Sequence, residues 1–286
     1  MTHKKKTRLK RLLIAVLLLV SFAVLLYPTF SSAWNQYRSS QLMTQYQQAV
    51  SSLSEEKLLT IRQEAESYNQ NHENNYITDV FDEEAQGISS EEYSTLLNVV
   101  DGGIMGYLEI PKIRQKLSVY HGTGAEVLEK GVGHLEGTSL PVGGTSTHSV
   151  LAAHRGLPGI RLFTDLDQME IHDRFFLYIA GTILEYEIDS ILTVEPEEVE
   201  YLDIVPDMDY VTLLTCTPYS VNSHRLLVRG HRVPYVEEHI KEETKKINII
   251  KTMDVSLKAF FAETIGCVLL LLLVIIRKHV NKRVKT

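Results

Sequence analysis

Apolar positions between residues 34 and 71 recur at roughly helical spacing within a stretch rich in Gln, Glu, Ser and Tyr. The residues that set this spacing in its first half are Leu42, Met43, Tyr46, Val50 and Leu53. Such a stripe is typical of an amphipathic helix that packs one face on a partner. Ser52, followed three residues later by Glu55, has the form of a capping box. The pattern therefore predicts two helices, the second beginning after Ser52.

The next segment, 70–90, is polar and acidic, so we expect a loop around 79–87. Ser89 and Glu92 again have capping-box spacing and predict a short helix that runs to Leu97. Residues 34–100 are thus expected to form a helical region interrupted by a loop.

From residue 106 onward the pattern changes to short β-rich segments punctuated by Gly and Pro. The strands that it predicts are 106–110, 117–121, 149–153, 174–179, 183–194, 210–216 and 225–233. Several short strands with few helices between them favour a mainly β fold, a closed or nearly closed barrel of about 130 residues. A segment of this length can bury one core.

Both ends of the chain carry long apolar runs. The first, 12–26, follows a cluster of Lys and Arg, and the second, 259–276, is apolar except for Glu263 and Thr264 and precedes another such cluster. A membrane span needs roughly 20 apolar residues, which the second run reaches if Glu263 lies at the level of the headgroups. Because basic flanks favour the cytoplasmic side, the pattern predicts two transmembrane segments with both termini in the cytoplasm and the chain between the segments outside.

Two alternatives to this membrane topology remain open. The first run, with Ser31-Ser32-Ala33 after it, also resembles a cleaved signal peptide. Both runs could instead be buried helices of a soluble protein. Retained or cleaved, a first segment that enters the membrane sends residues 34–254 to its outer side.

Charge narrows the range of partners. The formal net charge is −7, from 29 Lys and Arg against 36 Asp and Glu. Since basic residues cluster at the two ends, the segment between the apolar runs is more acidic than the whole chain. An acidic surface argues against nucleic acid or anionic lipid as the main partner of that segment.

The chain contains two cysteines, Cys216 and Cys267. Cys267 lies inside the second apolar run, so a membrane topology puts the two sulfur atoms in different phases, where they cannot pair. A lone thiol outside the cell is unusual, since structural cysteines there are normally oxidised in pairs. Cys216 is therefore expected to be kept for its chemistry, although a cysteine with apolar neighbours can also be inert core filling.

Three candidate chemical groups stand at strand ends. One apolar strand ends at His154, another ends at Cys216, and Arg225 opens the strand that follows. Imidazole can activate a thiol, and a guanidinium can stabilise the oxyanion of an acyl-transfer intermediate. Arg229 would share the strand face of Arg225, and the residues alone do not choose between the two. Three further histidines are expected to be surface or packing residues: His134, His172 and His231.

Four ordered motifs resemble those of the sortases, membrane-anchored cysteine transpeptidases of Gram-positive bacteria. They are Gly106-Tyr107-Leu108-Glu109-Ile110-Pro111, His134-Leu135-Glu136-Gly137-Thr138-Ser139-Leu140-Pro141, Ala153-His154-Arg155-Gly156 and Thr212-Leu213-Leu214-Thr215-Cys216. The last matches the TLxTC signature. The stretch that follows it, through Asn222 and His224 to Gly230, is similar to class C, the pilus-assembling branch.

The resemblance implies a closed eight-stranded sortase-type β-barrel with His154, Cys216 and Arg225 as the catalytic residues, and it chooses Arg225 over Arg229. It implies that Cys216 attacks the Thr–Gly bond of an LPxTG-like sorting signal and forms a thioacyl enzyme, with no metal or organic cofactor. His154 protonates the leaving amine. A lysine amine of another pilin subunit then resolves the thioacyl enzyme, so the implied partners are pilins and the lipid bilayer. Thr215 is grouped with the residues that bind substrate.

Class C sortases also cover the active site with a lid that bears an Asp-Pro-aromatic motif. The best match in this chain is Asp79-Val80-Phe81, in which valine replaces proline and leaves the loop less constrained. By this resemblance Phe81 covers Cys216 and Asp79 approaches Arg225. The alternative is an ordinary acidic surface loop.

In the resulting domain plan, one membrane segment precedes the helical region and the barrel, and the other follows them. Its parts are a basic tail 1–11, an N-terminal segment 12–30, a helical region 34–100 with a lid-like loop near 76–88, the barrel 101–236, a juxtamembrane linker 237–257, a C-terminal segment 258–276 and a basic tail 277–286.

Three other functions compete with pilin polymerisation. A housekeeping sortase would attach proteins to a cell-wall amine, and the two apolar ends with the long helical preface argue against it. A cysteine protease would more commonly orient its histidine with Asn or Asp than use arginine. A non-catalytic membrane scaffold would use the helical and acidic region alone.

Overall fold

The computed structural model describes residues 37–71, 79, 81, 90–100, 102–157 and 159–240, together with isolated positions between 17 and 35. Residues 1–235 form one compact unit and 236–286 another, and the first is described below. The predicted basic tails, the C-terminal segment 258–276 and most of the linker 237–257 lie outside the described residues, and the N-terminal segment 12–30 is described only at isolated positions. In these ranges no helix combines the length and the apolar character that a bilayer crossing requires.

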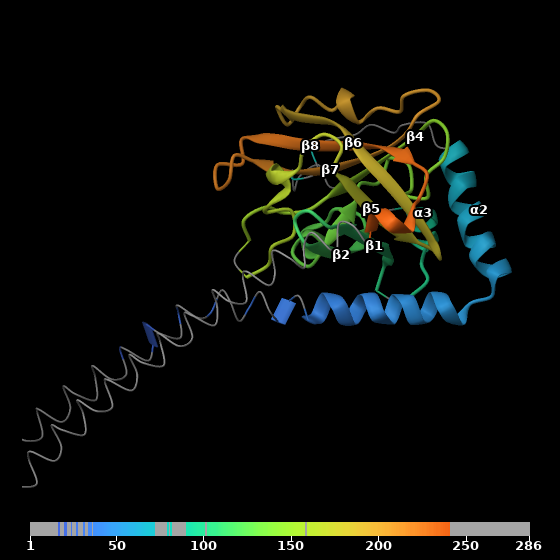
Figure 1. Cartoon of the computed structure of the whole chain (residues 1–286), viewed down its shortest axis with the longest axis horizontal. Coiled ribbons are helices and arrows are strands. Elements are labelled where there is room, and N and C mark those ends of the chain that lie inside the picture. Colours follow the sequence, from blue (N-terminus) through green and yellow to red (C-terminus); the bar gives the residue numbers. More distant parts are fainter. Residues whose placement is uncertain are drawn as a thin grey trace, which may run out of the picture. The chain divides into compact units, whose positions relative to one another are not determined.

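Eight strands close into a barrel, which confirms the mainly β fold (Figure 1). Around the barrel the strand order is β1-β2-β3-β4-β7-β8-β6-β5. The strands are β1 (Ile104–Ile110), β2 (Gln115–His121), β3 (Val132–His134), β4 (Thr147–Ala152), β5 (Arg174–Ile179), β6 (Thr182–Val194), β7 (Asp209–Thr217) and β8 (His224–Val233). Closure leaves the sheet without a free edge, so every strand has two neighbours.

Seven of these strands match the sequence pattern to within two residues at each end. The missing one is β3, whose sequence Val-Gly-His is three residues long. All three residues are buried, so there is no alternation of apolar and polar positions to detect, and a run this short gives no periodic signal.

Two strand pairs are parallel, β2 with β3 and β4 with β7, and the other neighbours are antiparallel. In the β4–β7 pair Ala152 lies opposite Leu214, and in the β7–β8 pair Cys216 lies opposite Arg225. The ends of β4 and β7 and the start of β8 therefore meet at the same rim of the barrel. Inside the barrel, buried apolar side chains from every side form the core, among them Leu108, Leu151, Phe175, Leu213 and Val228.

Helices cover part of the outside of this barrel (Figure 1). Residues 37–52 are helical, and α2 (Glu55–Asn71) follows after a short break. The hydroxyl of Tyr46 donates to the carbonyl oxygen of Met105 at 3.0 Å and accepts from the amide of Ala180 at 2.9 Å. Arg62 of α2 donates to the carbonyl of Ala180 at 2.6 Å. These bonds hold both helices on the barrel.

The break between the two helices lies two residues further on than the capping pattern predicts. The hydroxyl of Ser54, not Ser52, accepts from the amide of Lys57 at 3.3 Å, while Ser52 donates back to the carbonyl of Ala49 at 2.7 Å. Ser52 thus belongs to the end of the first helix. Either serine could satisfy the free amides of a helix start, so the choice depends on where the chain turns.

The remaining helices are short. They are α3 (Glu91–Thr95), α4 (Ala125–Leu128), η1 (Leu166–Gln168) and η2 (Glu200–Leu202). α3 is capped by Ser90, whose hydroxyl accepts from the amide of Tyr93 at 3.2 Å, and ends earlier than predicted. The predicted cap Ser89 lies outside the described residues.

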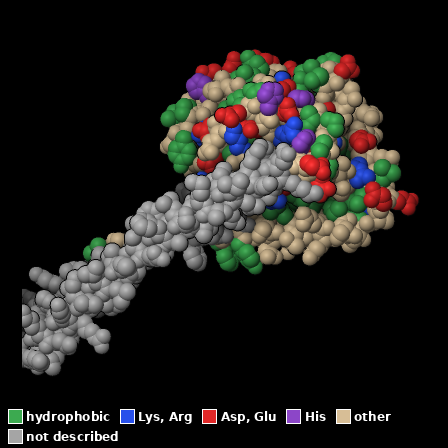
Figure 2. Space-filling view, viewed as in Figure 1, with side chains coloured by type: hydrophobic (Ala, Val, Ile, Leu, Met, Phe, Trp, Pro, Cys, Tyr) green, Lys and Arg blue, Asp and Glu red, His purple; other side chains and the backbone are tan. Residues whose placement is uncertain are grey.

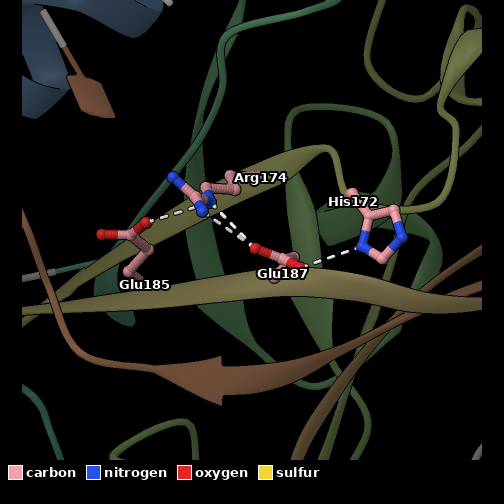
Figure 3. A network of polar contacts seen from close by, with 4 residues as sticks. All are labelled: His172, Arg174, Glu185 and Glu187. Carbon is pink, nitrogen blue, oxygen red and sulfur yellow. Dashed lines mark hydrogen bonds and ion pairs between the residues drawn. The ribbon is translucent and has the colours of Figure 1, made fainter.

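Acidic, basic and histidine side chains lie interspersed on the face of the molecule seen in Figure 2. One group forms a network between β5 and β6, with Arg174 between Glu185 and Glu187 (Figure 3). The Arg174 nitrogens lie 3.4 Å from Glu185 and 2.9 Å from Glu187, and His172 approaches Glu187 at 3.0 Å. Glu185 is completely buried, so its carboxylate needs a positive neighbour.

Replacing Arg174 by Met is expected to lower the free energy of unfolding by about 2 kcal/mol, because it removes the cation from a buried carboxylate. Urea denaturation of the full-length protein measures this change. The matched control is Arg161→Met, which removes a largely exposed arginine from its pair with Asp165 and should change the free energy of unfolding by less than about 0.5 kcal/mol. Equal effects of the two substitutions would contradict the role given to Arg174.

Candidate active site

The three predicted catalytic residues line one open pocket of about 300 Å³. Its lining consists of Phe81, Ala125, Leu128, His154, Cys216, Asn222 and Arg225. The residues come from four separate parts of the chain, namely the loop before α3, α4, the end of β4 and the β7–β8 hairpin. The structure thus brings together side chains that the sequence placed only at strand ends.

Backbone pairing at the rim positions His154 next to the strand of Cys216. The amide of Ala153 donates to the carbonyl of Leu214 at 3.1 Å, which extends the β4–β7 ladder by one residue. Thr215 adds a second link, because its hydroxyl donates to the carbonyl of Ala153 at 2.7 Å. His154 follows directly, and its carbonyl accepts from the amide of Phe163 at 3.2 Å. The backbone on both sides of His154 is therefore fixed.

Thr215 was grouped with the substrate-binding residues by sequence, but the structure places it elsewhere. Its side chain is completely buried, does not line the pocket and is bonded to Ala153. A buried hydroxyl must satisfy its hydrogen bonds inside the protein. Thr215 therefore joins two strands, and it can act on a substrate only through the residues that it positions.

The guanidinium of Arg225 is almost fully engaged. Its Nη1 donates to the carbonyls of Asn222 at 3.1 Å and His224 at 3.0 Å. Its other edge faces Asp79, with Nε donating to Oδ1 at 2.8 Å and Nη2 to Oδ2 at 2.5 Å. This two-bond arrangement matches the planar fork of arginine to a carboxylate.

Phe81 lines the pocket, and Asp79 lies beside it in contact with Arg225. Its ring centroid lies 5.5 Å from that of His154, with 35° between the planes, and the guanidinium carbon of Arg225 lies 5.2 Å from the Phe81 ring. The amide of Phe81 donates to Asp79 Oδ1 at 3.4 Å, a local bond across the residue between them. Val80 itself lies outside the described residues. Phe81 thus lies against His154 and Asp79 pairs with Arg225, which are the two contacts that the lid interpretation expects.

The other candidates of the same residue types lie apart from the pocket. Arg229 pairs with Asp189 at 3.0 Å and lies over the ring of Tyr210 at 4.1 Å, as a structural ion pair would. His134 is completely buried and bonded to Tyr93 at 2.8 Å, while exposed His172 contacts Glu187. His231 is half-buried and does not line the pocket either.

Burial shifts the two reacting groups toward their neutral forms. Burial raises the pKa of Cys216; the charge of Arg225 opposes this shift, and the charge of Asp79 adds to it. Burial also lowers the pKa of His154, against the opposing charge of Glu129. For Arg225 burial disfavours the charge, yet the bonds and charge of Asp79 outweigh it and raise the pKa. These directions favour a neutral thiol and a neutral imidazole beside a charged guanidinium.

The apolar wall of the pocket was not predicted from the sequence. Ala125 and Leu128 come from α4, a single turn between β2 and β3 that carries no periodic signal. Asn222 appeared only as part of a matched motif, without a role.

No cluster of three or more His, Cys, Asp or Glu side chains suited to a metal ion occurs within the ranges that the structure describes.

A thiol, an imidazole and a guanidinium in one pocket at a barrel rim define a cysteine enzyme equipped for acyl transfer. A family model described as a sortase domain matches residues 108–233. The chain is 43% identical to the solved sortase C-1 of Streptococcus pneumoniae, with a TM-score of 0.65, covering 68% of this chain and 100% of that one. The pilus-related sortase C of Group B Streptococcus is 42% identical with a TM-score of 0.62, covering 66% and 96%.

A curated relative, sortase D of Bacillus subtilis, is 30% identical over 135 residues. The match covers 46% of this chain and 65% of that relative, so somewhat less than two thirds of the relative's length is represented. Together with the solved structures, these matches show that the chain belongs to the sortase family of cysteine transpeptidases. Its structural neighbours are class C sortases.

Replacing Asp79 by Asn is expected to lower the pKa of Cys216, because it removes a negative charge and leaves the charge of Arg225 unopposed. The thiolate then forms at lower pH, and alkylation by iodoacetamide becomes fast at lower pH than in the parent protein. The measurement is the pH dependence of the alkylation rate in full-length protein carrying Cys267→Ala.

Asp207→Asn serves as the control, since it removes the same charge before the start of β7, at the other end of the strand from Cys216. A pH profile that is the same for Asp79→Asn and for the control would contradict the electrostatic contribution of Asp79.

Proposed function

We propose that the protein is a pilin-polymerising transpeptidase that cleaves an LPxTG-like sorting signal and transfers it to a lysine amine of another pilin. The observation that carries this proposal is the single pocket shared by His154, Cys216 and Arg225. The similarity to a sortase C that is named as pilus-related supports the choice of pilin as substrate. Housekeeping attachment to a cell-wall amine has no comparable observation in its favour.

In the first step Cys216 attacks the carbonyl carbon of the threonine in the sorting signal. Since thiol and imidazole are both neutral at rest, the proton moves from the sulfur to His154 as the carbon–sulfur bond forms. The carbonyl oxygen becomes an oxyanion, which the guanidinium of Arg225 stabilises. His154 then gives its proton to the glycine amine as the carbon–nitrogen bond breaks, and a thioacyl enzyme remains.

In the second step a pilin lysine amine, in its uncharged form, attacks the thioester carbon. The carbon–sulfur bond breaks, an isopeptide bond forms, and the proton of the amine returns to the sulfur through His154. Repeating the two steps joins pilins one after another. None of these transfers needs a metal or an oxidant, because every proton and electron pair passes between the substrates, Cys216 and His154.

Asp79 and Phe81 form a lid that must leave before either step. Asp79 holds the Nε and Nη2 edge of Arg225, and Phe81 lies against His154. A substrate carbonyl can reach that edge only after the carboxylate has moved. The lid thus keeps the enzyme inactive until a sorting signal displaces it.

The apolar runs 12–30 and 258–276 anchor the enzyme in the cell membrane, with the barrel on the outer side and both termini in the cytoplasm. The basic clusters beside both runs support this orientation. This topology puts Cys267 inside the membrane and Cys216 outside the cell, so the two cysteines of the chain cannot form a disulfide with each other.

Replacing Cys216 by Ala is expected to abolish pilin polymerisation, because no other described residue supplies a nucleophile in the pocket. Full-length variants are expressed in cells that lack other sortases, and high-molecular-weight pilin ladders are followed by immunoblotting. Cys267→Ala removes the other thiol and should leave the ladders unchanged. Pilin ladders that persist in the Cys216→Ala variant would contradict the proposal.

The same variants identify the chemical step. Full-length protein incubated with a Leu-Pro-Glu-Thr-Gly peptide should carry a thioacyl adduct on Cys216, detected by mass spectrometry, and Cys216→Ala should carry none. If the adduct forms but is transferred to cell-wall amines and not to pilin lysines, the function is housekeeping attachment rather than pilin polymerisation.

The topology is tested by protease treatment of intact protoplasts. The barrel should be digested, whereas epitope tags at both termini should be protected inside the cell. Digestion of the C-terminal tag from outside would contradict the proposed orientation. Loss of the N-terminal tag from the mature protein would show that the first segment is cleaved.

A further inference from the structure

Asn222 is the pocket-lining polar residue to which the proposed mechanism gives no role. Among the described residues that line the pocket, His154, Cys216 and Arg225 act in the chemistry, while Phe81, Ala125 and Leu128 are apolar. Asn222 is exposed, and within the described part of the chain its side-chain amide makes no hydrogen bond to another residue. An amide at this position offers two N–H donors toward whatever enters the pocket.

The backbone of Asn222 is fixed on both sides. Its amide donates to the carbonyl of Pro218 at 3.0 Å, and its own carbonyl accepts from Nη1 of Arg225 at 3.1 Å. Its φ is +60°, in the left-handed region that asparagine tolerates better than most residues. The side chain therefore projects from a rigid position in the hairpin that also carries Cys216 and Arg225.

The donors of Arg225 show why a second group is needed. Nη1 is held by two backbone carbonyls, so the guanidinium offers a substrate only the Nε and Nη2 edge that Asp79 occupies. An oxyanion in an acyl-transfer site is best stabilised by donors that reach it from more than one direction. The guanidinium supplies one direction, and Asn222, another residue that lines the same pocket, carries donors that can supply a second.

We propose that Asn222 is a further substrate-contacting residue, whose side-chain amide donates a hydrogen bond to the oxyanion that forms when Cys216 attacks the threonine carbonyl. This inference rests on the proposed function. No covalent bond to Asn222 forms or breaks, and no proton is transferred from it. Because the amide is neutral and does not titrate, its contribution is the same across the pH range in which the thiol and imidazole change charge.

A purely structural role for Asn222 has to be separated from this one, since its carbonyl holds Arg225. Asn222→Gly removes the amide but keeps the carbonyl and the freedom to adopt positive φ. Asn222→Asp keeps the shape but replaces the donor by a carboxylate that repels an oxyanion. The matched control is Ser220→Gly, in the same hairpin loop, since Ser220 is also at positive φ, +67°, and does not line the pocket.

All variants are made in full-length protein carrying Asp79→Ala, so that the lid does not limit the rates. Cleavage of a fluorogenic Leu-Pro-Glu-Thr-Gly peptide gives kcat and KM, and alkylation by iodoacetamide reports the reactivity of Cys216 without any oxyanion. We expect Asn222→Gly to lower kcat by roughly 100-fold with little change in KM. Asn222→Asp should lower kcat at least as much, and Ser220→Gly should match the parent. The alkylation rate should be the same in the parent, in Asn222→Gly and in Ser220→Gly. In Asn222→Asp the added carboxylate raises the pKa of Cys216, so this variant is compared with the parent at a pH where the alkylation rate of both has reached its plateau.

The results distinguish a contact between Asn222 and the oxyanion from a purely structural role of Asn222. The assignment is wrong if Asn222→Gly leaves kcat unchanged or changes only KM. It is also wrong if the alkylation rate of Asn222→Gly falls in parallel with kcat, because Asn222 would then only position Arg225 and Cys216. The thermal unfolding of each variant is recorded to verify folding, and Asn222→Asp decides the question if Asn222→Gly is unfolded. Absence of cleavage by the parent itself would count against the proposed function rather than against Asn222.

Discussion

The register of three adjacent strands, β4, β7 and β8, is the constraint on which the site depends. Parallel pairing sets the end of β4 beside Leu214, and antiparallel pairing sets Cys216 opposite Arg225. A shift of one residue in either pair would turn alternate side chains to the opposite face and separate the three groups. Closure of the barrel and the bond from Thr215 to Ala153 resist such a shift. Residues with no chemical role thereby fix the geometry of those that have one.

Burial at this rim of the barrel governs the electrostatics of the site. Burial favours the neutral forms of the thiol and the imidazole, while the guanidinium keeps its charge. A neutral thiol reacts poorly with oxidants and electrophiles, because the thiolate is the nucleophile. The burial of Cys216 therefore also protects this thiol from such reagents.

The sequence predicted the strands of the barrel well because most of them are long enough to show a pattern, and it failed where the pattern is absent. β3 is too short and uniformly buried, and α4 is a single turn, so the wall made by Ala125 and Leu128 was missed. Ser52 and Ser54 can each cap the start of a helix, and the path of the chain decides which of them does. A sequence motif gives the type of each residue but not the direction in which its side chain points, so it could not show that Thr215 is buried away from the pocket.

The contact between Asp79 and Arg225 joins residues 146 positions apart, and no local pattern encodes such a pair. Resemblance to other sortases suggested it, whereas Arg225 and Arg229 are equivalent by residue type alone. Only the structure gives Arg229 its own partner in Asp189.

The occupied edge of Arg225 makes Asp79 an intramolecular competitor of the oxyanion. Its effective concentration at that edge depends on how strongly the loop is held near the pocket, and a loop with valine in place of proline is less preorganised. Under the proposed mechanism a sorting signal must outbind this tethered carboxylate, so a weak ligand leaves the pocket closed. Residue 80 then sets the threshold of binding free energy above which a peptide is processed, although it takes no part in the reaction.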